Sequence, residues 1–168
     1  MSDSDLMQLA GFEFGIHDMP KEEIDTELLE DDMVMPSIKP QKKINGKPII
    51  VVIDDDYSTL DLMKIYLQRD YEYVAFDGPR DAIFYLNKNV PSLIFLDCYI
   101  NMISAKRVVE IIHSYKELEN VPIVYVTEPD EKGAIMAKGI TGVSDFITRP
   151  IARGTLQEIL DKYPDTRR

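Results

Sequence analysis

The chain has 168 residues, of which 45% are hydrophobic and 29% are charged, a composition typical of a globular domain with one core. Its net charge of -11 has the wrong sign for holding a phosphate backbone, so direct nucleic-acid binding is not expected. The single cysteine, Cys98, excludes an internal disulfide, and no apolar run reaches the ~18–20 residues that span a bilayer. These features predict a cytoplasmic protein without membrane insertion.

Charge divides the chain into three segments. Residues 1–38 contain eleven acidic residues and one basic residue, Lys21, and form an acidic N-terminal extension. Some apolar residues accompany the acids, so we expect this extension to be flexible or to fold on a partner, with packing against the domain as an alternative. The lysine-rich segment 39–47 is predicted to be a linker, and residues 48–168 to be the folded domain.

Within the domain, short apolar runs alternate with segments of helical period. The runs 49–53, 73–76, 93–96, 123–126 and 145–148 predict strands, the last one weakly. Helix-spaced apolar residues follow each strand, and the interval 130–140 is less clear because two glycines interrupt it. This alternation predicts an α/β fold: a flavodoxin-like, doubly wound (βα)5 domain with a five-stranded parallel sheet in the order 2-1-3-4-5.

Polar residues follow four of these strands. Asp54 and Asp55 come after the first, Asp97 after the third, Thr127 after the fourth and Arg149 after the fifth. The carboxyl ends of parallel strands share one edge, so three carboxylates should meet there and repel one another unless a cation neutralises them. Mg²⁺ prefers such oxygen ligands, and Thr127 and Arg149 suit a phosphoryl group.

Four motifs carry a resemblance to a known family: VVIDDDYSTLDLMKIYL, SLIFLD, VPIVYVT and DFITRP. With the steps of thirty residues from Asp97 to Thr127 and twenty-two from there to Arg149, residues 48–163 resemble response-regulator receiver domains, the phosphoacceptors of two-component signalling. The resemblance implies that Asp97 is phosphorylated. It also implies Mg²⁺ as cofactor, and a sensor histidine kinase or a phosphotransfer protein as partner.

The resemblance assigns the remaining roles by position. Asp54, Asp55 and Asp97 would bind the metal together with the backbone carbonyl of Tyr99. Thr127 and Phe146 would form the switch pair, which changes the surface made by helix 4, strand 5 and helix 5. For Phe146, a role as packed core aromatic is equally compatible with the sequence.

The chain departs from the family pattern at several positions. Arg149 stands where the family has a lysine, and Glu128 stands where a small residue normally follows the switch threonine. Asn101 and Ala105 replace the usual Pro and Gly, so the loop after Asp97 is expected to follow an altered path. We hypothesise that Glu128 and Arg149 form an ion pair over Asp97, in place of the usual contact between lysine and aspartate.

Two residues near the motifs receive a simpler interpretation. Asp56 is expected to cap the first helix rather than to bind the metal. Cys98 follows the phosphoacceptor without an obvious base nearby, so no chemistry is assigned to it.

The leading interpretation is a single-domain response regulator. It would signal by protein contact, with a possible homodimer through the helix 4, strand 5 and helix 5 face, and it would not be an enzyme. The alternative is a receiver-like interaction module that works without phosphorylation, which Glu128 and Arg149 favour. A phosphatase of the haloacid-dehalogenase type, suggested by Asp54-x-Asp56, fits poorly because Tyr57 and Ser58 stand where that motif requires a Gly-Thr-like continuation.

Overall fold

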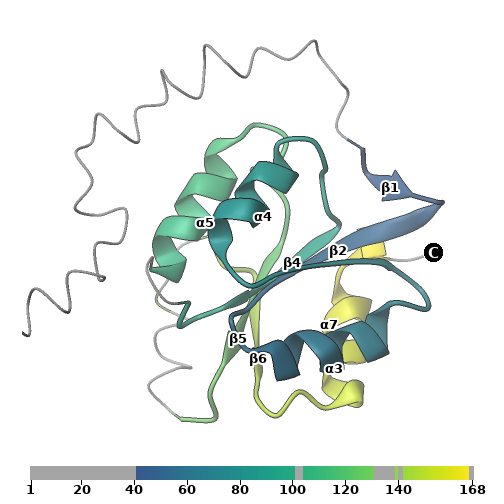
Figure 1. Ribbon diagram of the computed structural model, residues 1–168, viewed down its shortest axis with the longest axis vertical. Coiled ribbons are helices and arrows are strands. Elements are labelled where there is room, and N and C mark those ends of the chain that lie inside the picture. Colours follow the sequence, from purple (N-terminus) through teal and green to yellow (C-terminus); the bar gives the residue numbers. More distant parts are fainter. Residues whose placement is uncertain (1–40, 101–103, 131–138, 140–141, 167–168) are drawn as a thin grey trace, which may run out of the picture.

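The computed structural model describes residues 41–100, 104–130, 139 and 142–166 (Figure 1). Several predictions lie outside these residues. They are the acidic extension 1–38, the altered loop at Asn101 and most of the uncertain helical interval 130–140.

A parallel sheet forms the centre of the domain, with strands β2 (Lys47–Ile53), β3 (Glu72–Phe76), β4 (Leu93–Asp97), β5 (Ile123–Thr127) and β6 (Asp145–Thr148). Strand β2 pairs with β3 and β4, β4 pairs with β5, and β5 pairs with β6. The predicted order 2-1-3-4-5 of the parallel strands is therefore found as β3-β2-β4-β5-β6. Strands β4 and β5 are buried throughout, which explains their continuous apolar runs.

Helices cover both faces of this sheet (Figure 1). On one face, α4 (Pro79–Leu86) and α5 (Ala105–Ser114) contribute to one hydrophobic cluster; on the other, α3 (Tyr57–Leu67) and α7 (Arg153–Lys162) contribute to a second. Alternate residues of β2 belong to different clusters: Ile49, Val51 and Ile53 to the first, Ile50 and Val52 to the second. The domain is thus doubly wound, as predicted. None of the described helices is long and apolar enough to cross a bilayer.

The segment predicted as a linker contains part of the sheet. Strand β1 (Lys43–Ile44) pairs antiparallel with the start of β2, and β2 itself begins at Lys47. Asn45 and Gly46 connect the two strands with φ values of 52° and 78°. Asn-Gly is the preferred pair for a tight hairpin turn with two positive φ angles. The linker prediction for 39–47 is therefore wrong for the residues of this hairpin.

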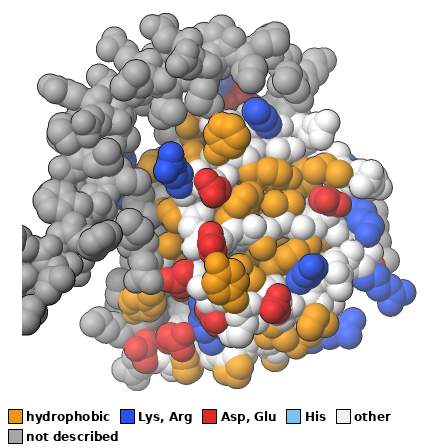
Figure 2. Space-filling model, viewed as in Figure 1, with side chains coloured by type: hydrophobic (Ala, Val, Ile, Leu, Met, Phe, Trp, Pro, Cys, Tyr) orange, Lys and Arg blue, Asp and Glu red, His pale blue; other side chains and the backbone are white. Residues whose placement is uncertain are grey.

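The face drawn in Figure 2 carries hydrophobic side chains interspersed with acidic and basic ones. Among the described residues, the exposed large hydrophobic side chains are Tyr57, Ile65, Phe84 and Tyr99. Phe84 lies on α4 with the ammonium of Lys88 5.1 Å from its ring centroid. Single exposed apolar side chains are common on soluble domains and contribute little to folding.

Phe95, which lies in β4 with no exposed surface, should be a main contributor to stability. We expect Phe95→Ala to lower the free energy of unfolding by about 3–5 kcal/mol, because it removes a buried ring and leaves a cavity. Phe84→Ala makes the same chemical change at a side chain that is 59% exposed and should cost less than about 1 kcal/mol. Urea unfolding of both variants measures this, and equal losses would contradict the assignment of the core.

Candidate functional site

The carboxyl ends of the parallel strands bring the predicted site residues to one edge of the sheet. Asp54 directly follows β2, Asp97 is the last residue of β4, Thr127 is the last residue of β5, and Arg149 directly follows β6. The sheet pairing continues past the strand ends, since the Asp54 amide donates to the Phe76 carbonyl at 3.0 Å. The backbone of these residues is therefore held by the hydrogen-bonded ends of the strands.

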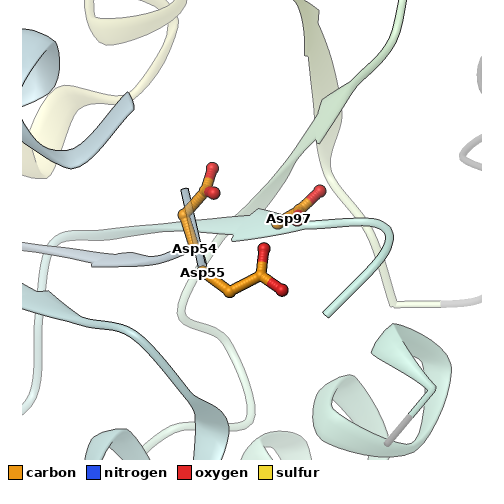
Figure 3. A group of neighbouring side chains, drawn as sticks. All are labelled: Asp54, Asp55 and Asp97. Atoms are coloured by element: carbon orange, nitrogen blue, oxygen red, sulfur yellow. The ribbon is translucent and has the colours of Figure 1, made fainter. Parts of the chain in front are cut away.

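Asp54, Asp55 and Asp97 form one cluster of carboxylates (Figure 3). Each offers an oxygen within 4.8 Å of the others. Asp54 is fully buried, Asp97 is 5% exposed, and Asp55 is partly exposed. Backbone amides orient two of them: Asp56 donates to Asp54 Oδ1 at 2.9 Å, and Tyr99 donates to Asp97 Oδ1 at 3.2 Å. The predicted meeting of the three acids is confirmed.

Arg149 reaches into this cluster. Its Nη2 lies 2.7 Å from Asp54 Oδ2 and 3.3 Å from Asp97 Oδ1, and only 15% of the side chain is exposed. The guanidinium thus bridges two of the three carboxylates. One positive charge leaves the cluster with an excess of negative charge when all three acids are ionised.

The hypothesised ion pair between Glu128 and Arg149 is present, with 3.1 Å between Arg149 Nε and Glu128 Oε1. The hypothesis that this ion pair replaces the contact with Asp97 is wrong, because Arg149 makes both contacts. The planar guanidinium presents several N–H groups in different directions, so one side chain reaches both acids.

Two further contacts of Arg149 were not predicted. Its Nη1 donates to the hydroxyl of Thr59 and lies 3.8 Å from Asp56 Oδ2. Thr59 and Arg149 are ninety residues apart, so no local sequence pattern announces this contact. A cavity of about 290 Å³ adjoins these groups, and its walls include Arg149, Asp56, Thr59 and Glu128.

Burial dominates the electrostatics of Asp54. Loss of solvation raises the pKa of Asp54 to about 6, although the Asp56 amide and Arg149 both act in the opposite direction. A buried carboxyl that resists ionisation beside two other acids is the environment in which a divalent cation is stabilising. The three carboxylates supply the oxygen ligands that Mg²⁺ prefers, so the donor set fits this ion.

Thr127 carries an unsatisfied hydroxyl at the same edge. The residue is 1% exposed, and its Oγ1 has no hydrogen-bond partner among the residues that the structure describes. A buried hydroxyl without a partner costs free energy, and at this edge the Thr127 hydroxyl could donate to a bound oxygen atom. Phe146, predicted as its switch partner, is partly buried on β6 against the cluster of α4 and α5.

Asp56 and Cys98 take the simpler roles predicted for them. Asp56 is the N-cap of α3, where it accepts hydrogen bonds from the Ser58 amide and from the hydroxyls of Ser58 and Thr59. These bonds lower the pKa of Asp56 to about 2. Burial raises the pKa of the Cys98 thiol to about 12, which opposes formation of a nucleophilic thiolate.

Asp54 should make the metal-free protein sensitive to pH. Its pKa is about 6 in the folded protein against an ordinary value of 3.8, so the folded state binds this proton more tightly. The stability it contributes is complete below about pH 4 and is lost as the pH rises from about 4 to 6. In EDTA, the unfolding free energy of Asp54→Asn relative to wild type should therefore increase over this range.

Chemical unfolding at several pH values measures this difference. Asp81→Asn changes an exposed acid in the first turn of α4 and should follow wild type throughout. Excess Mg²⁺ should flatten the profile of wild type. A constant difference between wild type and Asp54→Asn would contradict the assignment.

Known proteins resemble this chain in sequence and in fold. The family model of the response regulator receiver domain matches residues 50–161. Hybrid signal transduction histidine kinase D of Dictyostelium discoideum is 29% identical over 113 residues, which cover 67% of this chain and 7% of that protein. Response regulator PleD of Caulobacter vibrioides is 29% identical over 104 residues, which cover 61% of this chain and 23% of PleD.

Solved structures share the fold at lower identity. Chemotaxis protein CheY4 of Vibrio cholerae has a TM-score of 0.63 at 19% identity, covering 70% of this chain and 98% of CheY4. The receiver domain of sensor histidine kinase PA1611 from Pseudomonas aeruginosa has a TM-score of 0.64 at 19% identity, covering 70% of this chain and 97% of that one. In that structure a magnesium ion is coordinated in the active-site cleft.

The chain spans less than a quarter of the length of both named kinase and regulator relatives, so what they share with it is the receiver module. The fold, the three acids at one edge and the match over residues 50–161 agree with one another. The chain belongs to the response regulator receiver domain family.

Proposed function

We propose that this protein is a response regulator that accepts a phosphoryl group on Asp97 from a histidine kinase or a phosphotransfer protein. The observation that carries the proposal is the cluster of Asp54, Asp55 and Asp97 beside the hydroxyl of Thr127, which has no partner among the residues that the structure describes. Carboxylates that can bind a cation and a hydroxyl that can donate to an anion thus lie at the same edge of the sheet. This combination suits a phosphoryl group held together with a divalent ion.

Each residue has a definite part in the transfer. An oxygen of the Asp97 carboxylate attacks phosphorus while the bond from phosphorus to the donor histidine nitrogen breaks, and the imidazole leaves with its electron pair. Asp54, Asp55 and Asp97 would hold Mg²⁺, as the PA1611 receiver holds a magnesium ion in its cleft. When bound, the ion neutralises negative charge on the carboxylates and on the phosphoryl oxygens. The backbone carbonyl of Tyr99 remains the predicted fourth protein ligand.

Thr127 and Arg149 would bind the new phosphoryl group. The Thr127 hydroxyl, now without a partner among the described residues, would donate to a phosphoryl oxygen. Arg149 already contacts Asp97 through Nη2 and would balance the added charge. The Asp97 carboxylate is the reacting group and is regenerated only when the phosphoryl group leaves, so we infer a switch rather than an enzyme that turns over a separate substrate.

Signal output would follow from the added charge. Phosphorylation adds roughly -1.5 to -2 charges, which bias Thr127 and Phe146 toward a second arrangement. The affected surface includes β6 and α7, through which we propose contact with a downstream protein or with a second copy of this chain. The kinase and the regulator among the relatives support a place in two-component signalling, in the cytoplasm where the composition predicts this chain to be.

One observation favours a second function. Arg149 bridges Asp54 and Asp97, so a positive charge of the chain itself partly neutralises the site. A receiver stabilised in this way could bind its partner constitutively. Partner binding that is unchanged by phosphodonor and by Asp97→Asn would favour this interaction module over the phosphoacceptor.

Asp97→Asn should abolish phosphorylation, because an amide oxygen is a far weaker nucleophile than a carboxylate. Wild type incubated with acetyl phosphate and Mg²⁺ should gain the mass of one phosphoryl group, which intact-protein mass spectrometry detects. Asp77→Asn is the matched control, since Asp77 follows β3 at the same edge but pairs with the Tyr57 hydroxyl at 2.8 Å. The control should be labelled like wild type. Labelling of Asp97→Asn, or none of wild type under these conditions, would refute the proposed acceptor.

A further inference from the structure

The guanidinium of Arg149 has two separate sets of acceptors. Its inner contacts are those of Nη2 with Asp54 Oδ2 at 2.7 Å and Asp97 Oδ1 at 3.3 Å. Its outer contacts are those of Nε with Glu128 at 3.1 Å and of Nη1 with the Thr59 hydroxyl. Each of the three nitrogens thus has its own protein partner.

The inner contacts use oxygens of two residues in the proposed metal site. Mg²⁺ binds carboxylate oxygens at about 2.0–2.1 Å and tolerates little distortion of its octahedral geometry. A guanidinium nitrogen on the same carboxylates would repel the ion at short range and would hold lone pairs that the ion needs. An ion bound at Asp54 Oδ2 and Asp97 Oδ1 would therefore weaken or break the contacts of Nη2 with these oxygens.

The outer contacts give the displaced guanidinium a place to remain. Glu128 and Thr59 keep two of its nitrogens paired, and Asp56 Oδ2 lies 3.8 Å from Nη1. The cavity of about 290 Å³ is walled by this outer set, so there is room for the side chain to withdraw toward it. The Glu128 side chain is 55% exposed, and it contacts Nε, whereas Asp54 and Asp97 contact Nη2.

We infer that Arg149 is an intramolecular competitor of the divalent ion at the acid cluster, and that Glu128 is a positioning residue that draws the guanidinium away from Asp54 and Asp97. The inference rests on the metal site of the proposed function but does not require phosphorylation. Arg149 would occupy the acids when Mg²⁺ is scarce and give them up when it is abundant. Glu128 sets the balance between the two arrangements.

Binding of Mg²⁺ to the full chain, measured by titration calorimetry without any phosphodonor, tests the competition. Arg149→Lys keeps the positive charge but replaces the fork with a single ammonium group, so a change in affinity reports on the bridge rather than on net charge. We expect the variant to bind Mg²⁺ about tenfold more tightly, the factor that corresponds to one charge-assisted hydrogen bond. In EDTA, the unfolding midpoint of Arg149→Lys should be lower than that of wild type. Added Mg²⁺ should raise the midpoint of the variant by more than it raises that of wild type.

A double-mutant cycle tests Glu128. Glu128→Gln should weaken Mg²⁺ binding severalfold, and this effect should disappear in the Arg149→Met background, because Glu128 acts through Arg149. Loss of a nearby negative charge alone would weaken binding equally in both backgrounds, which would overturn the role of Glu128. Glu128 is exposed, so Glu128→Gln should fold even if Arg149→Lys does not.

The outcomes separate this inference from the proposed function. Equal Mg²⁺ affinity of wild type and Arg149→Lys would overturn the competition while leaving the metal site in place. Absence of Mg²⁺ binding in both would overturn the competition and the proposed metal site together. Tighter binding by Arg149→Lys supports the competition whether or not Asp97 accepts a phosphoryl group.

Discussion

The site depends on an excess of negative charge among buried carboxylates at one edge of the sheet. Asp54, Asp55 and Asp97 lie within reach of one ligand, and two of them, Asp54 and Asp97, are buried. Arg149 contacts these two buried acids. Burying carboxylates is unfavourable unless positive charge compensates them. Loss of solvation keeps the pKa of Asp54 raised, because its effect exceeds that of the Arg149 guanidinium, which acts in the opposite direction. A divalent cation is the charge that complements this arrangement.

The fold tolerates the unfavourable free energy of burying these carboxylates because the centre of its sheet is continuously apolar. Strand β2 has buried residues from Pro48 to Ile53, and it divides them between two clusters that four described helices cover. The stability gained there offsets the unfavourable burial of Asp54 at the strand end. Because all five major strands run parallel, their carboxyl ends lie at one edge, and the polar residues that end them converge without any further specification.

Local patterns explain what the sequence predicted correctly. The apolar runs of β2, β4 and β5 and the acids that follow the first two are visible within a few residues, and so is the capping role of Asp56. The hairpin at Asn45 and Gly46 also had a local signal, which the lysine-rich composition of 39–47 obscured. The contact of Arg149 with Thr59 joins residues 90 positions apart, and no local pattern marks Thr59 as its partner.

Two of the departures from the family pattern, Arg149 and Glu128, are best understood as one feature. An arginine in the position of the usual lysine brings five N–H donors into a half-buried site, and donors that lack acceptors would be costly there. Asp54 and Asp97 accept from one nitrogen, which leaves Nε and Nη1 to be satisfied. Glu128, which follows β5, pairs with Nε, and Thr59, which lies in α3, accepts from Nη1. Glu128, the acidic residue beside Thr127, is thus an acceptor for the additional donors that an arginine brings to position 149.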